Sequence, residues 1–344
     1  MKKFAHTAWM SLLALAATTV SFAASAQATI KLKVTHPLPA THFLWTEGMK
    51  KVTDGITEKT KGRVQFEVYP ASQLGTDHFT ALRSGLADVA MLVTPYYPDK
   101  FPMTSVTELP GLYSTACEAT NKYWQLAKPG AILDRLEYAP QGIRIIMAST
   151  LPPYSLSTTS KKLETLEDLS GKRIWANGAA QDKLLRTLGA IPVRLIASEL
   201  FESLSRGTID GVLMNYLAHT QYKLETKLRH SVQGVELGGG SWVLAVTEKA
   251  WQAMPAELRE TFTTVGSTAQ GDLCKWMDTE SLKSLAQVTA AGLVVNKLSP
   301  AQAALWKSKV DTVAASWAND MNATGKRGTE LLEAMRKASG EAAK

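Results

Sequence analysis

The feature that most constrains the fold is an alternation of strand-like and helix-like segments, which occurs twice along the chain. In the first run, residues 30–35 and 64–68 alternate apolar and polar side chains, as half-buried strands do, and residues 88–93 form a short apolar run. Segments 41–62 and 75–85 lie between these strands and carry apolar residues at helical spacing. Strands that alternate with helices in this way indicate a parallel sheet covered by helices.

A second run repeats this order further along the chain. Helical spacing there ends at Gly189 and again at Gly207, and strand-like segments stand on either side of each helix. Two separate α/β runs, at about 29–150 and 151–240, predict two domains. The later strands are expected at 143–147, 172–175, 192–196 and 209–214.

The remainder of the chain is mainly helical, with helical spacing from Leu258 to Trp276 and another helix opening at Ser299. We therefore predict an α/β fold of two domains, each a mixed or parallel sheet flanked by helices, with a long helix spanning both. The expected limits are 29–150 plus about 241–290 for domain I, 151–240 plus about 291–300 for domain II, and 300–344 for C-terminal helices.

Residues 1–28 have the pattern of a secretory signal peptide. Lys2 and Lys3 precede an apolar stretch that ends at Phe22, and the small residues of 24–28 fit an A-x-A cleavage pattern. The apolar stretch is shorter than the roughly 20 residues that a membrane-spanning helix needs. We therefore expect export to the periplasm with cleavage of this segment.

The charge of the chain is diffuse. The formal net charge is +7, and removal of Lys2 and Lys3 with the signal peptide would lower it to +5 (7 − 2). The basic residues do not gather in a stripe, as those of a nucleic-acid binder do. The sequence therefore predicts no nucleic-acid partner.

The two cysteines, Cys117 and Cys274, lie far apart in the sequence. Export would permit a disulfide between them, because the periplasm is oxidising. Two buried free thiols fit the sequence equally well, since spacing alone does not decide between the two states.

Motifs of common enzymes are missing from the sequence. There is no G-x-S-x-G, no H-E-x-x-H, no Walker loop and no G-x-G-x-x-G after a strand. His36 and His42 are close in sequence, but no third metal ligand is suggested near them. We therefore expect a binding protein rather than an enzyme, with no catalytic residues, no cofactor and no metal.

Three segments resemble the extracytoplasmic solute receptors of tripartite ATP-independent periplasmic (TRAP) transporters, the DctP-type family. The likeness extends over nearly all of the chain that follows the signal peptide. It is carried by residues 82–112, with a G-x-A-D strand entry and E-L-P, by residues 166–178 (LEDLSGKRIWANG), and by residues 184–211, which end in SELFESLSRGTIDG.

This resemblance implies two α/β domains that close over one small ligand, usually a carboxylate. It also implies docking on a small and a large TRAP membrane subunit. The expected ligand is therefore a small organic anion, an acid whose body is aromatic or branched, and the expected receptor is a monomer. A zwitterionic or amide-containing solute is the alternative, and a periplasmic enzyme on the same scaffold is a weaker one.

Two departures from the family pattern bear on the ligand. Most members carry an arginine at the position of Trp175, where it grips the ligand carboxylate through two parallel hydrogen bonds, and an indole cannot do so. Arg173 stands two residues earlier and would replace it only if the local strand path shifted. Asn215 and Tyr216 stand where relatives often have proline and tryptophan, and Asn215 adds an amide donor and acceptor.

Ligands of open α/β sheets bind at strand ends and the loops that follow them. For Trp175, a wall for an apolar ligand or a cation–π face competes with simple core packing. Either of the two tyrosines at 96 and 97 fits a hydrogen bond to the ligand or packing between the domains. The candidate ligand-binding residues are Trp175, Asn215, Tyr96, Tyr97, Thr94, Pro153, Tyr154, His42, Asn177, Tyr216, Trp242 and Arg173.

Overall fold

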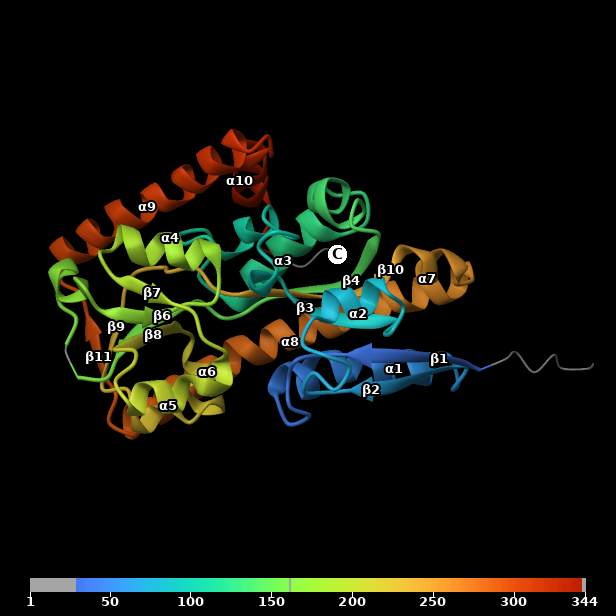
Figure 1. The fold of residues 1–344 in the computed structure, drawn as a ribbon, viewed down its shortest axis with the longest axis horizontal. Helices are drawn as coiled ribbons and strands as arrows, with labels where there is room; N and C mark the ends of the chain where they lie inside the picture. Colours follow the sequence, from blue (N-terminus) through green and yellow to red (C-terminus); the bar gives the residue numbers. More distant parts are fainter. Residues whose placement is uncertain (1–28, 161, 342–344) are drawn as a thin grey trace, which may run out of the picture.

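The computed structural model describes residues 29–160 and 162–341. The predicted signal peptide, residues 1–28, lies outside the described residues. Two mixed sheets, each flanked by helices, form the frame of the molecule, and this confirms the predicted fold class (Figure 1). Among the described residues, no helix combines the length and the apolar character that a bilayer crossing requires.

The first sheet, called sheet A, has the strand order β2-β1-β3-β10-β4. Strand β1 pairs in parallel with both β2 and β3, whereas β10 runs antiparallel to β3 and to β4. The late strand β10 therefore returns to the sheet built by the first part of the chain. The strands are β1 (Ile30–Thr35), β2 (Val64–Tyr69), β3 (Val89–Val93), β4 (Ile143–Thr150) and β10 (Ser241–Thr247).

The second sheet, called sheet B, has the strand order β11-β9-β5-β8-β6-β7. Strand β6 pairs in parallel with β7 and β8, and β5 runs antiparallel to β8 and β9. The strands are β5 (Ser155–Thr158), β6 (Arg173–Trp175), β7 (Ile191–Val193), β8 (Gly211–Met214), β9 (His230–Gln233) and β11 (Val294–Lys297).

The chain crosses between the sheets at several points. Residues 151–154 join β4 to β5 and residues 234–240 join β9 to β10, so two short connections lie side by side in the middle of the molecule. The longest helix, α8 (Ala256–Ala290), contacts β4 and α1 on the sheet A side and α6 on the sheet B side, as Figure 1 shows. This agrees with the predicted spanning helix, whereas the exact domain limits stay a prediction.

Shorter helices cover the sheets. Asp77, Thr115 and Asn215 each accept a hydrogen bond from a backbone N–H in the first turn of the following helix, and thereby cap it. The helices are α1 (Lys50–Lys59), α2 (His78–Arg83), α3 (Ala116–Ala127), α4 (Ala179–Thr187), α5 (Leu200–Ser205), α6 (Tyr216–Gln221), α7 (Glu248–Ala253), α9 (Pro300–Ala323) and α10 (Gly328–Lys337), with the 3₁₀ turns η2 (Thr94–Tyr96) and η3 (Thr104–Glu108).

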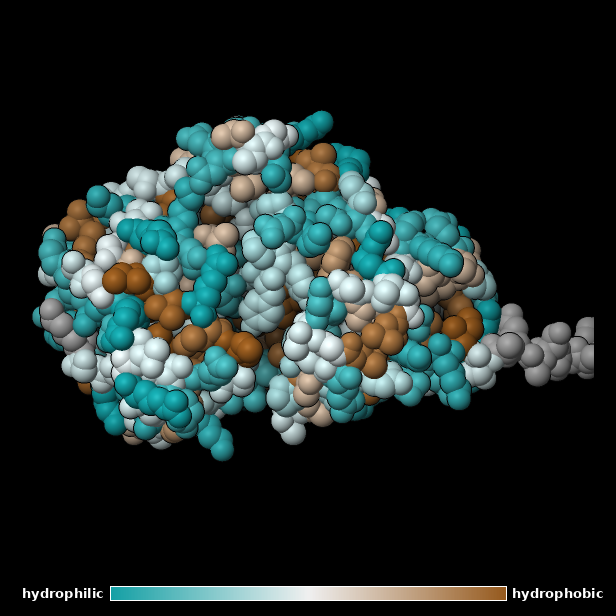
Figure 2. Space-filling view, in the orientation of Figure 1, coloured by the Kyte–Doolittle hydropathy of each residue, from teal (hydrophilic) through white to brown (hydrophobic). Residues whose placement is uncertain are grey.

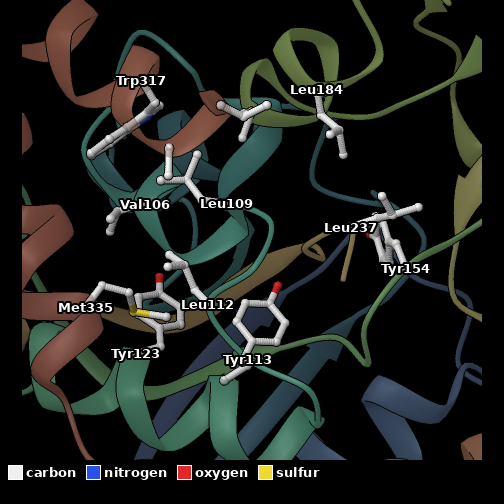
Figure 3. Packing of buried hydrophobic residues seen from close by; sticks show 14 of the residues in the cluster. Val106, Leu109, Leu112, Tyr113, Tyr123, Tyr154, Leu184, Leu237, Trp317 and Met335 are labelled. Atoms are coloured by element: carbon white, nitrogen blue, oxygen red, sulfur yellow. The ribbon is translucent and has the colours of Figure 1, made fainter. Parts of the chain in front are cut away.

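A continuous hydrophobic core joins the two halves. In Figure 3, Leu184 of α4 and Trp317 of α9 pack in one cluster with Val106 and Leu109, which belong to η3 and the residue that follows it. Because this cluster takes side chains from the segments that flank both sheets, the two halves are not independent globules.

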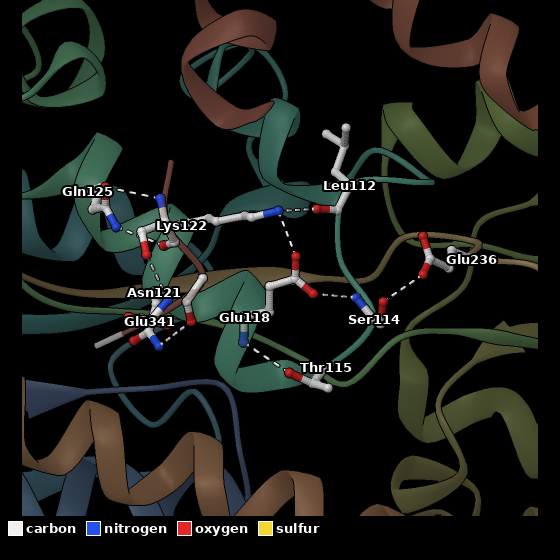
Figure 4. A network of polar contacts seen from close by, with 11 residues as sticks. Leu112, Ser114, Thr115, Glu118, Asn121, Lys122, Gln125, Glu236 and Glu341 are labelled. Atoms are coloured by element: carbon white, nitrogen blue, oxygen red, sulfur yellow. Dashed lines mark hydrogen bonds and ion pairs between the residues drawn. The ribbon is translucent and has the colours of Figure 1, made fainter. Parts of the chain in front are cut away.

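Polar contacts tie α3 to the same region. Figure 4 shows Glu118 accepting hydrogen bonds from the Ser114 N–H and Lys122, while the Ser114 hydroxyl donates to Glu236 in the β9–β10 connection. This network fixes the start of α3 against one of the two crossing segments.

A disulfide joins Cys117 to Cys274 and so links α3 to α8 across 157 residues of sequence. The sequence left this pairing open, and the structure resolves it in favour of the bond.

Candidate ligand site between the two sheets

A cavity lies where the strand ends of sheet A face those of sheet B. Its empty volume is about 610 Å³, which includes the space at its open mouth. In Figure 2, hydrophobic surface lies on both sides of the furrow between the two halves of the molecule. The cavity is lined by Leu38, His42, Phe43, Leu44, Met91, Val93, Tyr96, Leu151, Tyr154, Trp175, Asn177, Ala197, Met214, Asn215, Ala218, Tyr222, Gly240, Ser241 and Trp242.

The sheet A wall is built by the first residues of β10. Trp242 is 1% exposed and pairs across the sheet with Val93 and Ser149. Ser241 is held from behind, because its hydroxyl lies 2.6 Å from Thr94 Oγ1 and donates to Glu108 Oε1 over 2.8 Å. The wall is therefore rigid and presents an indole beside a hydroxyl that is already engaged.

The sheet B wall is built by the ends of β6 and β8. Trp175, the last residue of β6, is 2% exposed, and its indole Nε1 donates to the carbonyl of Leu195 over 3.0 Å. This hydrogen bond fixes the indole against the chain that follows β7 and leaves the ring, without its polar atom, to contact a ligand. The Trp175 ring is thus both part of the core and part of the cavity wall.

Asn215, the residue after β8, has two tasks. Its Oδ1 accepts a hydrogen bond from the Ala218 N–H over 2.8 Å and caps α6. Because the oxygen is identified by this bond, the other amide atom is the Nδ2 donor, and it is buried with no partner among the described residues. Asn215 therefore offers a ligand a free donor, and its acceptor is occupied.

Three tyrosines contribute hydroxyl groups to the lining. Tyr96 is 47% exposed and stands at the mouth, whereas Tyr154 is buried. Burial raises the pKa of Tyr154 and that of Tyr222 above the ordinary range of a phenol. These two hydroxyls therefore stay neutral at physiological pH.

His42 is the one residue of the lining whose side chain could carry a positive charge. Burial lowers the pKa of His42 to about 4, and the nearby His36 adds to this effect. His42 Nδ1 accepts a hydrogen bond from the Leu44 N–H over 3.2 Å. The imidazole is thus neutral at physiological pH, and its proton sits on Nε2.

Glu108 lies directly behind Ser241 and is fully enclosed. Burial raises the pKa of Glu108 to about 8, which outweighs the opposing effect of the hydrogen bond from Ser241. The carboxyl group is therefore protonated and uncharged over most of the physiological pH range.

The structure brings seven of the twelve candidate residues to the cavity. They come from loops and strand ends of both sheets, as the rule for open α/β sheets predicts. They are His42, Tyr96, Tyr154, Trp175, Asn177, Asn215 and Trp242.

Four other candidates lie away from the lining. Thr94 stands behind Ser241. Tyr97 turns into the core, where it packs on Phe79 and its hydroxyl accepts from the His78 N–H. Tyr216 is outside the lining and shares a hydrogen bond with Ser231 of β9, and Pro153 is half-buried in the β4–β5 connection, also outside the lining.

Arg173 also lies outside the cavity, and the idea that it replaces the family arginine is wrong for this structure. Strand β6 keeps a regular register, so the Arg173 side chain does not shift toward Trp175. Its guanidinium instead pairs with Asp210 at 3.0 Å and donates to the Gly207 carbonyl on the protein surface.

Several lining residues were not among the candidates. Met214 ends β8 and so lies beside Asn215. Tyr222 follows α6, and no pattern in the sequence places it at a strand end. Ser241 supplies a hydroxyl that is already hydrogen-bonded. The others supply apolar or backbone surface: Leu38, Phe43, Leu44, Met91, Val93, Leu151, Ala197, Ala218 and Gly240.

Within the part of the chain that the structure describes, no group of three His, Cys, Asp or Glu side chains is arranged to hold a metal ion. Three buried polar atoms of the lining have no partner among these same residues: Asn177 Oδ1, Asn215 Nδ2 and Trp242 Nε1. Buried polar atoms are normally paired, so these three are candidates for contact with a bound solute.

Comparison with known proteins identifies the family. The model of a family described as bacterial extracellular solute-binding protein, family 7, matches residues 36–320, well over half of the chain. A solute-binding protein of Albidiferax ferrireducens is 23% identical over 305 residues, which cover 85% of this chain and 88% of that protein.

Solved structures show the same fold. A TRAP solute-binding protein from Rhodoferax ferrireducens, in complex with copurified benzoate, is 24% identical with a TM-score of 0.79, covering 90% of this chain and 97% of that one. A TRAP periplasmic solute-binding protein from Bordetella bronchiseptica, with bound mandelate, is 23% identical with a TM-score of 0.80, covering 90% and 98%. With the family match, these results establish that the chain belongs to family 7 of the bacterial extracellular solute-binding proteins, the TRAP-type solute receptors.

Proposed function

We propose that this chain captures one small organic solute with an aromatic or branched apolar body in the cavity between its two sheets. The observation that supports this most directly is the lining itself, which combines aromatic side chains from both sheets. Mostly apolar walls with a few well-placed polar groups are typical of small-molecule sites.

The relatives support the size and shape of this solute. The two solved structures hold benzoate and mandelate, each with a single aromatic ring and a carboxylate. In this chain, the faces of Trp175 and Trp242 would stack against such a ring from opposite sheets. An organic acid has an apolar body and a negative charge. The aromatic walls support the apolar body.

Capture would proceed by closure of the two halves of the molecule, each built on one sheet, around the solute. Contacts to a ligand from both sheets stabilise the closed arrangement more than the open one, and only such differential contacts shift the balance. The connections 151–154 and 234–240 are the segments between the sheets where rotation would occur.

Delivery completes the proposed role. As a TRAP-type receptor, the chain would act in the periplasm as a monomer and pass its solute to a small and a large membrane subunit. Co-purification with those two subunits from a bacterial membrane, dependent on solute, would test this step.

Thermal unfolding in the presence of candidate solutes tests the capture itself. A solute that binds only the folded state raises the melting temperature by mass action. We expect single-ring aromatic compounds to raise it more than straight-chain compounds of the same size. If no aromatic or branched solute raised it at millimolar concentration, the proposal would fail.

A pair of variants assigns the effect to the cavity. Tyr96→Ala removes a lining side chain at the mouth and should weaken the thermal shift. Ile191→Ala removes an exposed apolar side chain of β7 that is not in the lining, and should leave the shift unchanged.

A further inference from the structure

We propose that the solute held in this cavity is uncharged, and that it is an aromatic carbonyl compound that also carries an N–H or O–H donor, of which a primary aromatic amide is the simplest. This inference depends on the proposed function, because it names the chemical class that the same cavity would accept. It follows from the charges and unpaired polar atoms of the lining.

The lining contains no charged side chain. None of its nineteen residues is Lys, Arg, Asp or Glu, and its histidine is neutral at physiological pH, because burial lowers the pKa of His42 to about 4. A buried carboxylate that lacks a cationic partner loses its hydration without compensation. The cavity therefore discriminates against an anion.

Charged groups around the cavity do not supply the missing cation. Arg194 borders an adjoining surface groove together with Tyr96 and Asn177, but its guanidinium is bound to Asp182 at 2.6 Å and 2.9 Å. The group directly behind the Ser241 hydroxyl is an acid, Glu108, which would repel an anion whenever it ionised.

Two unpaired hydrogen-bond donors in the lining indicate that the ligand carries a carbonyl group. Asn215 Nδ2 and Trp242 Nε1 both belong to residues that are 1% exposed, and neither has a partner among the described residues. The identity of each as a donor is certain chemically, since Asn215 Oδ1 is used by the Ala218 N–H and an indole nitrogen only donates. An acceptor oxygen on the solute would satisfy them.

One unpaired hydrogen-bond acceptor in the lining indicates that the ligand also carries an N–H or O–H donor. Asn177 Oδ1 is buried without a partner among the described residues. A carboxylate has no proton to offer it, whereas an amide N–H or a hydroxyl does. A neutral solute with both a carbonyl oxygen and a donor fits all three atoms, and the aromatic walls fit its ring.

Matched pairs of ligands test the charge directly. Benzamide and benzoate, and mandelamide and mandelate, differ mainly in charge and in donor protons. By calorimetric titration of the full-length mature protein at pH 7 and low salt, we expect each amide to bind about tenfold or more tightly than its acid, because the anion is desolvated without a counter-charge.

The outcomes separate the two proposals. Tighter binding of the acids, or equal binding of both members of a pair, would overturn the inference and leave the capture of an aromatic solute standing. Failure of every member to bind would overturn capture of such solutes as well. Tighter binding of the amides supports both.

Two arginine variants provide a second test. Tyr96→Arg places a cation in the lining at a half-exposed position that can accommodate it, and should shift the amide-to-acid affinity ratio toward the acid by about tenfold. Leu282→Arg adds the same charge on α8, at a side chain that is 72% exposed and outside the lining, and should leave the ratio unchanged. An unchanged ratio in Tyr96→Arg would contradict the idea that the missing cation sets the preference.

Discussion

At the scale of single residues, the two amide atoms of Asn215 have different roles: the oxygen caps α6, and the nitrogen is free to bind a ligand. Asn215→Ser keeps an oxygen that can cap α6 but removes the free amide donor. We expect solute affinity to fall by about tenfold while unfolding free energy changes by less than about 0.5 kcal/mol, because Ser and Asn cap helices about equally well. Calorimetric titration and urea unfolding measure the two quantities.

The matched control is Asn215→Ala, which removes the cap and the donor together. It should lose affinity to the same extent and also about 1 kcal/mol of stability. A Ser variant that binds the solute as tightly as the natural protein would show that Asn215 Nδ2 does not contact the ligand.

Glu108 leads to a prediction about pH. Because burial raises the pKa of Glu108 to about 8, the folded state binds a proton that the unfolded chain has released above about pH 4.5, the ordinary value. This contribution to stability is therefore complete at low pH and is lost as the pH rises toward 8. Glu108→Gln removes that loss, so its stability relative to the natural protein should improve by at least about 1.4 kcal/mol between pH 5 and pH 8, the equivalent of one pKa unit.

Urea unfolding of both proteins at pH 5, 6.5 and 8 measures this difference. Glu260→Gln on the exposed face of α8 is the control and should show no such trend. A constant difference between Glu108→Gln and the natural protein across this range would contradict a raised pKa.

Sequence patterns predicted several site residues but not the directions of their side chains. Tyr96 and Tyr97 are adjacent, and the turn η2 sends the first to the cavity mouth and the second into the core. The indole N–H of Trp175 is consumed by the Leu195 carbonyl, twenty residues away. Contacts of this kind depend on the packing of distant segments, which periodicity does not encode.

At the scale of elements, the run Gly238–Gly240 is required by close packing in the β9–β10 connection. Gly238 has φ of 76°, and a Cβ there would run into the Glu108 carbonyl oxygen, which belongs to backbone that cannot easily move. We expect Gly238→Ala to lower unfolding free energy by clearly more than the roughly 1 kcal/mol that a left-handed conformation costs a non-glycine residue.

Gly234→Ala, in the same connection, is the matched comparison. Gly234 has φ of 100°, but a Cβ there meets nothing within 4 Å, so only the conformational cost applies. Urea unfolding of the two variants side by side tests the difference. If both lost the same stability, the close approach to Glu108 would not matter energetically.

Element order could be predicted from the sequence better than sheet membership. The alternating patterns of 30–35 and 64–68 and the apolar run of 88–93 all correspond to strands of sheet A. The position of β10 between β3 and β4 was not apparent, since a strand paired on both sides by distant segments carries no local signal of its neighbours. The walls of the site depend on that placement, because β10 supplies Ser241 and Trp242.

At the scale of the whole molecule, the two halves share a core and are also joined by α9. Trp317 of α9 donates to the Ser105 hydroxyl in η3, and Lys183 of α4 donates to Ser316 of α9 and pairs with Asp320. The helix therefore ties the segment η3 to the helix α4 that flanks sheet B. If the sheets move relative to each other, the side that α9 holds together would act as the pivot. The opposite side, where Tyr96 and Ile196 lie, would open.

Closure across that side can be measured with two spin labels. The chain has two cysteines, Cys117 and Cys274, and the disulfide occupies both, so cysteines introduced by Asp99→Cys and Ile196→Cys can be labelled selectively. Asp99 follows Pro98, which lines the adjoining groove from the segment after β3, and Ile196 lines the same groove from the segment after β7. Because a ligand held by both sheets favours the closed arrangement, saturating benzamide should shorten and narrow the distance distribution between the labels.

A pair of labels within one half distinguishes closure of the two halves from a general loss of motion throughout the protein. Asp99→Cys combined with Glu67→Cys places both labels beside sheet A, and their distance distribution should not change with ligand. If the Asp99–Ile196 distances also stayed constant at a ligand concentration that saturates binding by calorimetry, the solute would enter a cavity that is already formed, and affinity would depend on the fixed lining alone. A shift confined to the cross-cavity pair would instead show that binding free energy is partly used to hold the two sheets together around the solute.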